Sequence, residues 1–267
     1  MGRIEINMLL FLRYNSVSHK LRTFFLKKPR LDFTQPCLNE TEASKLINGL
    51  ISLRGPGCQD YLEIGVEFGR TLNAINSSRV YGVDPSPLFI SDVGNDRLVL
   101  VKSPSDHFFS TLASNQVFDF IFLDGLHTYD QTLRDFRNSL EHVSADSVIV
   151  IDDVLPVDEY SASPDMWQSI RIRKRLGLDG MAWHGDVYKV IFDILEKVPH
   201  LNVKIVKDKD FLNGRAIVWG FNSSEIPKQL SDATHRDKSF SDYRDLVNKK
   251  SLVCDWRTFQ GVFRPGS

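Results

Sequence analysis

Short apolar runs alternate with helical segments through the middle of the chain. Runs rich in β-branched and other apolar residues occupy positions 60–64, 79–83, 98–101, 117–123 and 147–151. A polar turn or a stretch with helical spacing follows each of them. Strands that are apolar throughout, with helices between them, indicate a parallel sheet covered on both faces. The pattern therefore predicts an α/β fold with a doubly wound sheet.

Two later apolar runs, at 202–206 and 216–221, are joined by the turn-rich segment 208–214. This spacing predicts an antiparallel pair that closes one edge of the sheet, preceded by a helix over 186–197. Near the other end of the chain, Asn39 or Thr41 is expected to cap a helix that continues to about Leu53. The Gly-Pro-Gly sequence at 55–57 then ends that helix.

The first 30 residues are strongly basic, with seven Lys or Arg side chains and one acid. Apolar residues recur there at steps of three and four from Met8 to Phe25, which predicts an amphipathic helix. Two interpretations stand: the helix packs on its own domain or a partner subunit, or it lies on an anionic membrane surface. The apolar run 8–12 is too short for the core of a secretory signal.

The composition is that of an ordinary soluble globular protein: 267 residues, of which 42% are hydrophobic and 25% are charged. No stretch approaches the roughly 20 apolar residues of a membrane-spanning helix. Three cysteines far apart, without a Cys-x-x-Cys pair, exclude a disulfide framework and a thiolate zinc site. They suit a reducing compartment, so we expect a cytoplasmic protein, peripheral to the membrane if the N-terminal helix binds a lipid surface. No nucleic acid is expected as a partner.

In a doubly wound sheet, ligands bind at the carboxyl ends of the strands. The first strand is followed by Gly65 and Gly69, which allow a tight turn and a close approach to a ligand. Glu67 occupies the place where a dinucleotide fingerprint needs glycine, and its carboxylate would repel a pyrophosphate. Asp84, at the end of the second strand, is placed to accept hydrogen bonds from ribose hydroxyls, or else it caps a turn. Together these features favour a nucleoside-bearing ligand other than NAD or FAD.

Three aspartates follow the fourth and fifth strands: Asp124, Asp152 and Asp153. If the strands are neighbours, the three carboxylates converge, and a hard divalent cation such as Mg²⁺ would relieve their repulsion. The alternative is that they cap the following helices. His127 suits a general base, a metal ligand or a structural histidine equally well.

After the third strand, Ser105 and Asp106 are placed to cap a helix or to bind an adenine edge. Of these, capping is the simpler expectation.

In these features the chain resembles class I S-adenosylmethionine (SAM)-dependent methyltransferases, and in particular the branch of sugar O-methyltransferases. The matching motifs are Glu63-Ile64-Gly65-Val66-x-x-Gly69-x-Thr71, Val80-Tyr81-Gly82-Val83-Asp84-Pro85, the segment 118–129 with Asp124-Gly125-x-His127-x-Tyr129, and the segment 148–153. The resemblance covers about residues 40–221 and implies a seven-stranded, mostly parallel sheet with an antiparallel hairpin.

The resemblance also implies roles for the strand-end residues. Glu63 and Gly65 would lie along the methionine part of SAM, Asp84 would hold the ribose, and Ser105 and Asp106 would lie near the adenine. In metal-dependent members, the acids matching Asp124, Asp152 and Asp153 bind Mg²⁺. Some members carry a second aspartate in an Asp-Gly-Asp run. That position is Leu126 here, which makes His127 the leading candidate for the general base.

The segment 154–185 is predicted to be a lid over the acceptor within a methyltransferase domain at 37–221. The domain lies between the basic segment 1–36 and a C-terminal extension, 222–267. In the lid, His184 is a second candidate base. Its aromatic and basic side chains fit a sugar ring and an anionic group, or else they form a solvated helix face. They are Trp167, Arg171, Arg173, Lys174, Arg175 and Trp183.

The predicted function is Mg²⁺-assisted O-methylation of a sugar, nucleotide-sugar or surface-glycan hydroxyl, as part of glycan biosynthesis. The alternatives are an NAD-dependent oxidoreductase and a non-catalytic nucleoside-binding module on the same fold. Glu67 counts against the oxidoreductase, whereas the leucine at 126 permits the binding module.

Overall fold

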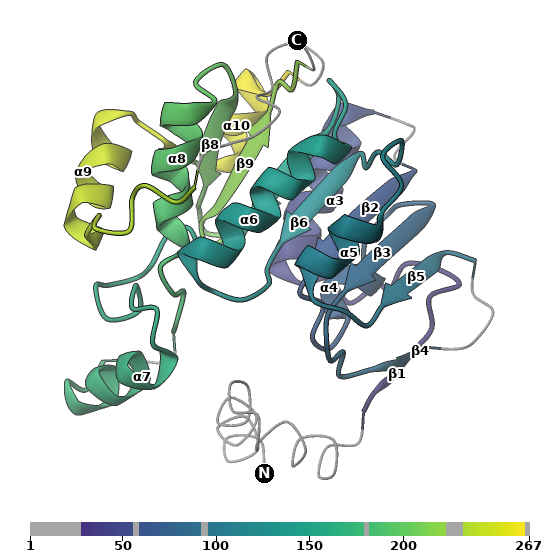
Figure 1. Ribbon diagram of the computed structural model, residues 1–267, viewed down its shortest axis with the longest axis horizontal. Helices are drawn as coiled ribbons and strands as arrows, with labels where there is room; N and C mark the ends of the chain where they lie inside the picture. Colours follow the sequence, from purple (N-terminus) through teal and green to yellow (C-terminus); the bar gives the residue numbers. More distant parts are fainter. Residues whose placement is uncertain (1–27, 56–58, 92–95, 179–181, 223–231, 265–267) are drawn as a thin grey trace.

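The computed structural model describes residues 28–55, 59–91, 96–178, 182–222 and 232–264 (Figure 1). Its main sheet has the strand order β10-β8-β9-β7-β6-β2-β3-β5. The strands are β2 (Asp60–Ile64), β3 (Arg79–Val83), β5 (Leu98–Val101), β6 (Phe120–Leu123), β7 (Val148–Ile151), β8 (Asn202–Val206), β9 (Arg215–Trp219) and β10 (Val253–Cys254). Two short strands, β1 (Arg30–Leu31) and β4 (Ile90–Ser91), pair separately in parallel.

All seven strands predicted from the apolar runs are confirmed. Neighbouring strands from β5 to β7 are parallel, and β9 runs antiparallel to both β7 and β8. The last run ends earlier than expected because Gly220, at φ 86°, turns the backbone out of the strand. The chain order reverses between β2 and β6, so a crevice is expected at the carboxyl ends of these two strands.

Helices cover both faces of the sheet, as the doubly wound pattern predicts (Figure 1). One apolar layer unites the sheet with α5, α6, α8 and α9, and the other unites it with α3, α4 and α10. The helices are α3 (Glu42–Arg54), α4 (Arg70–Asn73), α5 (Ser105–Thr111), α6 (Tyr129–Ser139), α7 (Met166–Arg175), α8 (Val190–Lys197), α9 (Phe240–Lys249) and α10 (Trp256–Val262), with 3₁₀ turns η1 (Leu140–His142) and η2 (Val187–Lys189).

Thr41 is the residue that caps α3. Its hydroxyl accepts a hydrogen bond from the Ser44 amide, and the Ser44 side chain accepts one from the Thr41 amide in return. This reciprocal arrangement satisfies two amides that the first turn leaves without helical partners. The expected helix over 186–197 consists of η2 followed by α8.

The sheet has one strand more than the seven expected. The additional strand is β10, which comes from the C-terminal region and pairs in parallel with the edge strand β8. Its two residues are too few to produce a readable alternation in the sequence. Phe259 of the following helix α10, and Phe263 just after that helix, pack against Trp219 of β9. The C-terminal region is therefore part of the main core.

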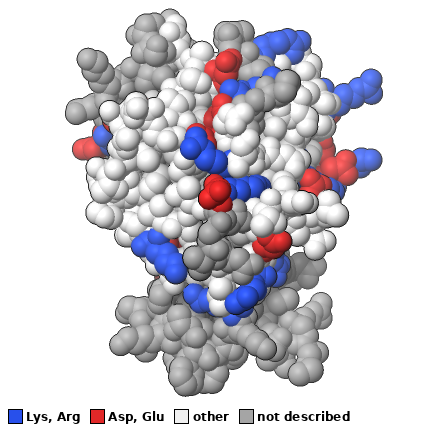
Figure 2. Space-filling view, turned by 90° about the vertical axis from the view of Figure 1, so that its right-hand side faces the viewer, with Lys and Arg blue, Asp and Glu red and all other residues white. Residues whose placement is uncertain are grey.

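The predicted basic helix at the start of the chain lies outside the described residues. Among the helices that the structure does describe, none is both long and apolar enough to cross a membrane. The face seen in Figure 2 shows acidic and basic side chains interspersed on a largely uncharged surface. On the described part of that face, no large patch of one charge forms.

Candidate functional site

A cavity of about 330 Å³ opens at the carboxyl ends of β2, β3 and β6, where the order of the strands reverses. Four of the predicted site residues line it: Gly65, Asp84, Ser105 and Asp124. The other lining residues are Ile64, Glu67, Val83, Pro85, Ser86, Leu88, Pro104, Gly125, Leu126, Gln131 and Asp135. The cavity thus occupies the crevice in which this class of sheet binds ligands.

Gly65 and Asp84 shape the wall of this cavity. A Cβ atom on Gly65 would lie 2.0 Å from the Asp124 carbonyl oxygen, and its φ is +87°, so only glycine fits there. The Asp84 carboxylate accepts hydrogen bonds from the amides of Val66 (3.2 Å), Glu67 (3.1 Å) and Ser86 (2.6 Å). These bonds fix the carboxylate at the edge of the cavity and tie the two strand-end loops together.

Ser105 has a different role from the helix cap that was expected. The residue that precedes α5 is Pro104, and no side chain caps that helix. The Ser105 hydroxyl instead accepts a hydrogen bond from the Gln131 amide at 3.1 Å. The same amide donates to Asp135 at 3.0 Å. A polar group of three side chains therefore lies at this end of the cavity.

The remaining predicted cofactor residues lie outside the cavity lining. Asp106 is half exposed and pairs with Arg134 at 3.4 Å, while Gly69 precedes α4 beside Phe89. Glu63 is buried, and its carboxylate accepts a hydrogen bond from the Tyr61 hydroxyl at 2.7 Å. Burial raises the pKa of Glu63 well above its usual value, which favours a neutral carboxyl group.

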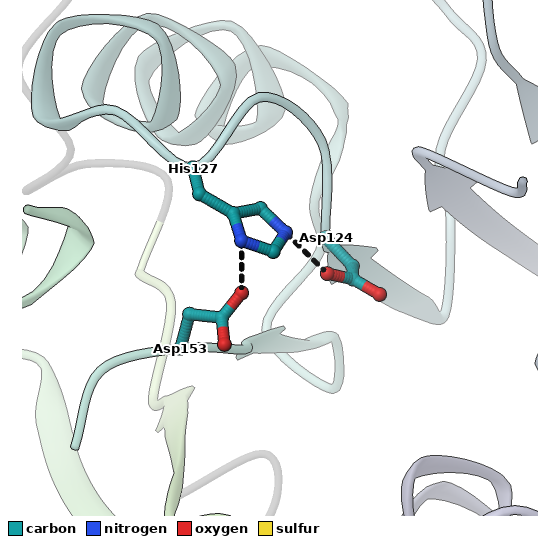
Figure 3. A group of neighbouring side chains, drawn as sticks. All are labelled: Asp124, His127 and Asp153. Atoms are coloured by element: carbon teal, nitrogen blue, oxygen red, sulfur yellow. Dashed lines mark ion pairs between the residues drawn. The ribbon is translucent and has the colours of Figure 1, made fainter. Parts of the chain in front are cut away.

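A buried histidine lies between two aspartates beside the cavity (Figure 3). His127 Nε2 is 3.3 Å from Asp124 Oδ1, and His127 Nδ1 is 2.9 Å from Asp153 Oδ2. Neither contact has the alignment of a hydrogen bond. One potential ligand atom from each residue lies within 4.8 Å of the other two. We call these three residues the Asp–His–Asp cluster.

Charge and backbone geometry both set this cluster apart. Burial by itself would lower the pKa of His127, but the carboxylates of Asp153 and Asp124 outweigh it and raise that pKa well above the usual value. Asp153 has a φ of +60°, a left-handed conformation that is uncommon for residues other than glycine. Strained backbone of this kind concentrates at functional sites.

Asp152 does not join the Asp–His–Asp cluster, although it was expected to share a metal with Asp124 and Asp153. Its carboxylate pairs with Arg215 at 3.0 Å, and the guanidinium comes from the adjacent strand β9. Burial raises the pKa of Asp152, and the charge of Arg215 opposes that rise. The cation that offsets this third carboxylate is therefore a side chain.

The segment 183–189, at the end of the predicted lid, holds the loop that carries His127. The Trp183 ring stacks on the imidazole, with centroids 4.9 Å apart and planes 21° apart. A Cβ atom on Gly185 would lie 1.7 Å from the His127 carbonyl oxygen. The Asp186 carboxylate accepts a hydrogen bond from the Tyr129 amide at 2.8 Å, at the start of α6. Trp183, Gly185 and Asp186 therefore hold the loop that carries His127 in place.

His184, the second candidate base, is buried in the same segment. Its backbone amide donates to the Ser161 carbonyl at 2.9 Å. Burial lowers the pKa of its imidazole, against the charges of Asp153 and Asp152. Two histidines near the same carboxylates thus have pKa values displaced in opposite directions.

Three residues at this site were missed in the sequence: Gln131, Asp135 and Arg215. Asp135 had a readable signal, because it lies between Leu133 and Phe136 in a stretch with helical spacing. It is 2% exposed, and burial raises its pKa to about 6. Arg215 gave no such signal, since its pairing with Asp152 depends on the order of the strands.

The comparisons with known proteins agree with this geometry. Residues 62–154, which include the end of β2, the cavity wall and the Asp–His–Asp cluster, match the model of a family described as a methyltransferase domain. By this match, the chain carries a methyltransferase domain at residues 62–154. None of the curated proteins matches this chain.

Solved structures of methyltransferases resemble the domain at low sequence identity. An O-methyltransferase from Bacillus cereus, in complex with S-adenosylhomocysteine (SAH), is 16% identical at a TM-score of 0.45, covering 68% of this chain and 82% of its own. A SAH-bound methyltransferase from Podospora anserina is also 16% identical, at 0.45, covering 83% and 97%. A SAM-bound O-methyltransferase from Streptomyces achromogenes is 13% identical, at 0.43, covering 79% and 98%.

Proposed function

We propose that this methyltransferase transfers the methyl group of SAM to a hydroxyl group of a sugar, nucleotide-sugar or glycan. The observation that carries the proposal is the position of Asp124, which lines the cofactor cavity and also belongs to the Asp–His–Asp cluster. A proton acceptor thus lies beside the space in which we place the cofactor. Methylation of a hydroxyl needs such a group, because a neutral hydroxyl is a poor nucleophile.

In this proposal the protein supplies mainly alignment. The methyl sulfonium is already a strong electrophile, so the transfer depends on a nucleophile held in line with the S–CH₃ bond. Asp84 would receive the ribose hydroxyls, and the group of Ser105, Gln131 and Asp135 would face the adenine. Gly65 would let the methionine part of SAM approach the backbone. The acceptor hydroxyl would then lie near His127.

The cluster also fits a divalent cation. Two carboxylates and one imidazole offer three ligand atoms within 4.8 Å, and both ring nitrogens lack an aligned hydrogen bond. Asp124 and Asp153 would supply the oxygen ligands that Mg²⁺ prefers, and His127 would extend the choice to softer divalent ions. Such an ion, when bound, lowers the pKa of a coordinated hydroxyl.

His127 must be neutral to accept a proton. In the protein alone, the two flanking carboxylates favour the imidazolium form. A cation held by the two carboxylates would reduce their negative charge and lower this pKa, and a ring nitrogen that does not itself bind the cation could then accept the proton. Asp124 and Asp153 therefore hold the imidazole in place and also set its basicity, while Trp183 fixes the plane of its ring.

The oxidoreductase alternative is weaker. Glu67 lines the cavity at the strand-end turn, with a φ of +41°. A carboxylate there disfavours the pyrophosphate of a dinucleotide, whereas SAM carries no phosphate.

Calorimetry and a methyl-transfer assay test the proposal together. SAM and SAH should bind the protein, NAD should not, and methyl transfer to a panel of sugars and nucleotide-sugars should be lost in Asp124→Asn and His127→Gln. The variant His107→Gln, an exposed histidine on α5, serves as the control. Failure to bind SAM would refute the proposal, as would full activity of His127→Gln. Activity that survives a chelator would refute only the role of the cation, and the proposed methyl transfer would stand.

A further inference from the structure

A second hollow, larger than the cofactor cavity, lies on the other side of the Asp–His–Asp cluster along the strand order. Its volume is about 970 Å³. The walls are the segment 155–162, the turn residue Tyr188, the ends of β8 and β10, and one face of α9. We call it the α9 groove. The roles proposed so far, for the SAM cavity and for His127, assign no function to this groove.

The α9 groove shares two of its walls with the surroundings of His127. The segment 155–162 begins two residues after Asp153, and its Ser161 carbonyl accepts the His184 amide at 2.9 Å. Tyr188 lies in the same 183–189 segment whose Trp183 stacks on the imidazole. A molecule in the α9 groove would therefore contact the same two segments that hold the cluster. This arrangement fits the non-reacting part of an acceptor.

The charges in the α9 groove are unequally satisfied. Of its two acids, Asp158 pairs with Arg173 of α7, and Glu159 accepts a hydrogen bond from Tyr160. Its two bases are Lys207, just after β8, and Arg244 on α9. Both are exposed, and neither has an acidic partner within the described residues. Because Arg173 neutralises Asp158, the charged groups left in the lining of the groove are Glu159, Lys207 and Arg244.

Apolar surface accompanies these two cations. Val157 is 54% exposed and Val253 is 38% exposed, and both line the α9 groove together with Phe240. Exposed apolar side chains of this kind pack against the carbon skeleton of a ligand such as a sugar ring. Unpaired guanidinium and ammonium groups bind carboxylate or phosphate. The two features together are complementary to a sugar that carries an anionic group.

We propose that the α9 groove binds an anionic group on the acceptor, a carboxylate or a phosphate, through Lys207 and Arg244. The inference rests on the proposed function, because it names the acceptor that the same site would methylate. It places the donor, the reacting hydroxyl and the anchoring group in one line along the carboxyl edge of the sheet. The anionic group contributes binding, and His127 contributes chemistry.

Matched sugars separate the two anions and provide the test. Glucose, glucuronate and glucose 6-phosphate are titrated into the protein saturated with SAH, and binding is followed by NMR or calorimetry. Glucuronate or glucose 6-phosphate should bind more tightly than glucose. Lys207→Glu and Arg244→Glu should each weaken that anion about tenfold, because each replaces an attractive charge with a repulsive one. Lys249→Glu, an exposed cation of α9 outside the groove, should leave binding unchanged.

The outcomes are distinct from those of the proposed function. Equal binding of the anions by wild type and both charge-reversal variants would overturn the α9 groove as their site. Equal affinity for glucose and for both anions would overturn the anionic acceptor. SAM affinity, measured in the same variants, should not change, since both substitutions lie outside the cofactor cavity. Failure of the wild-type protein to bind SAM would refute the proposed function itself.

Discussion

On the cofactor side of the site, Asp84 is held by amides within the two strand-end loops that it joins. On the other side, His127 lies between two carboxylates and beneath a tryptophan that comes from the 154–185 insert. The first arrangement uses hydrogen bonds from uncharged backbone amides to one carboxylate, between near neighbours in the fold. The second uses a buried imidazole between two partly exposed carboxylates, and a distant segment of the chain holds it in place.

This difference separates binding from chemistry. A nucleoside can be recognised by a rigid strand-end turn, which the sheet supplies directly. A proton acceptor also needs a tuned pKa, and tuning requires burial and neighbouring charge. We therefore expect changes on the cofactor side to affect affinity, and changes in the 183–189 segment to affect turnover and stability.

The largest effect should come from Gly185→Ala. This glycine has a φ of +63°, and the added methyl group would lie 1.7 Å from the His127 carbonyl oxygen. Left-handed strain together with displacement of packed backbone should lower the free energy of unfolding by at least about 3 kcal/mol. Urea denaturation measures this change.

Gly177→Ala is the matched control for that substitution. Gly177 has a similar φ of +67°, but no atom lies within 4 Å of the added methyl group. It should lose only about 1 kcal/mol, the cost of the backbone conformation. Equal losses in the two variants would show that the contact between Gly185 and the His127 loop contributes nothing.

Asp84→Ala should have the next largest effect, on SAM affinity rather than on turnover. If the carboxylate holds the ribose, SAM affinity should fall about 10- to 100-fold, as expected for losing charge-assisted hydrogen bonds. Turnover at saturating SAM should stay near that of the wild type. Calorimetry gives the affinity, and steady-state kinetics give the turnover. A large fall in turnover with unchanged SAM affinity would contradict the separation between the two sides.

The sequence reveals these two sides unequally. The strands, the Gly65 turn and Asp84 were all readable, because apolar runs and the residues that follow them are local patterns. Asp124 and His127 were also readable as members of one short motif. The set of neighbours around them was not, since it depends on which strands lie side by side.

Asp152 and Arg215 illustrate the limit. Adjacent aspartates at the end of one strand look alike in the sequence, yet only Asp153 faces His127, because its backbone adopts a φ of +60°. Asp152 lies against Arg215, which reaches it only because β9 inserts beside β7. Positive φ values outside glycine and cross-strand ion pairs have no local sequence signal.

Trp183→Ala should lower turnover about tenfold, because a stacked aromatic pair contributes about 0.5–1.5 kcal/mol and fixes the plane of the imidazole. Trp183→Phe keeps a stacking ring and should recover most of the activity, although it loses the indole bond to the Ser163 carbonyl. SAM affinity should change in neither variant. If phenylalanine restored nothing, the indole bond rather than the stacking would hold the histidine.

The smallest effect should be the part of the pH dependence of stability that comes from His127. Its pKa in the folded protein lies well above the ordinary value of 6.5, so its contacts with Asp153 and Asp124 stabilise the fold fully below that value. The stabilisation should then be lost as pH rises from about 6.5 through the folded-state pKa, by up to about 1.4 kcal/mol per pH unit. Urea unfolding of wild type and His127→Gln, compared from pH 6 to 9, should show a difference that shrinks with rising pH. His107→Gln should follow the wild type throughout. A difference that stayed constant over this range would mean that the imidazole is neutral between the two carboxylates and is ready to accept a proton without further help.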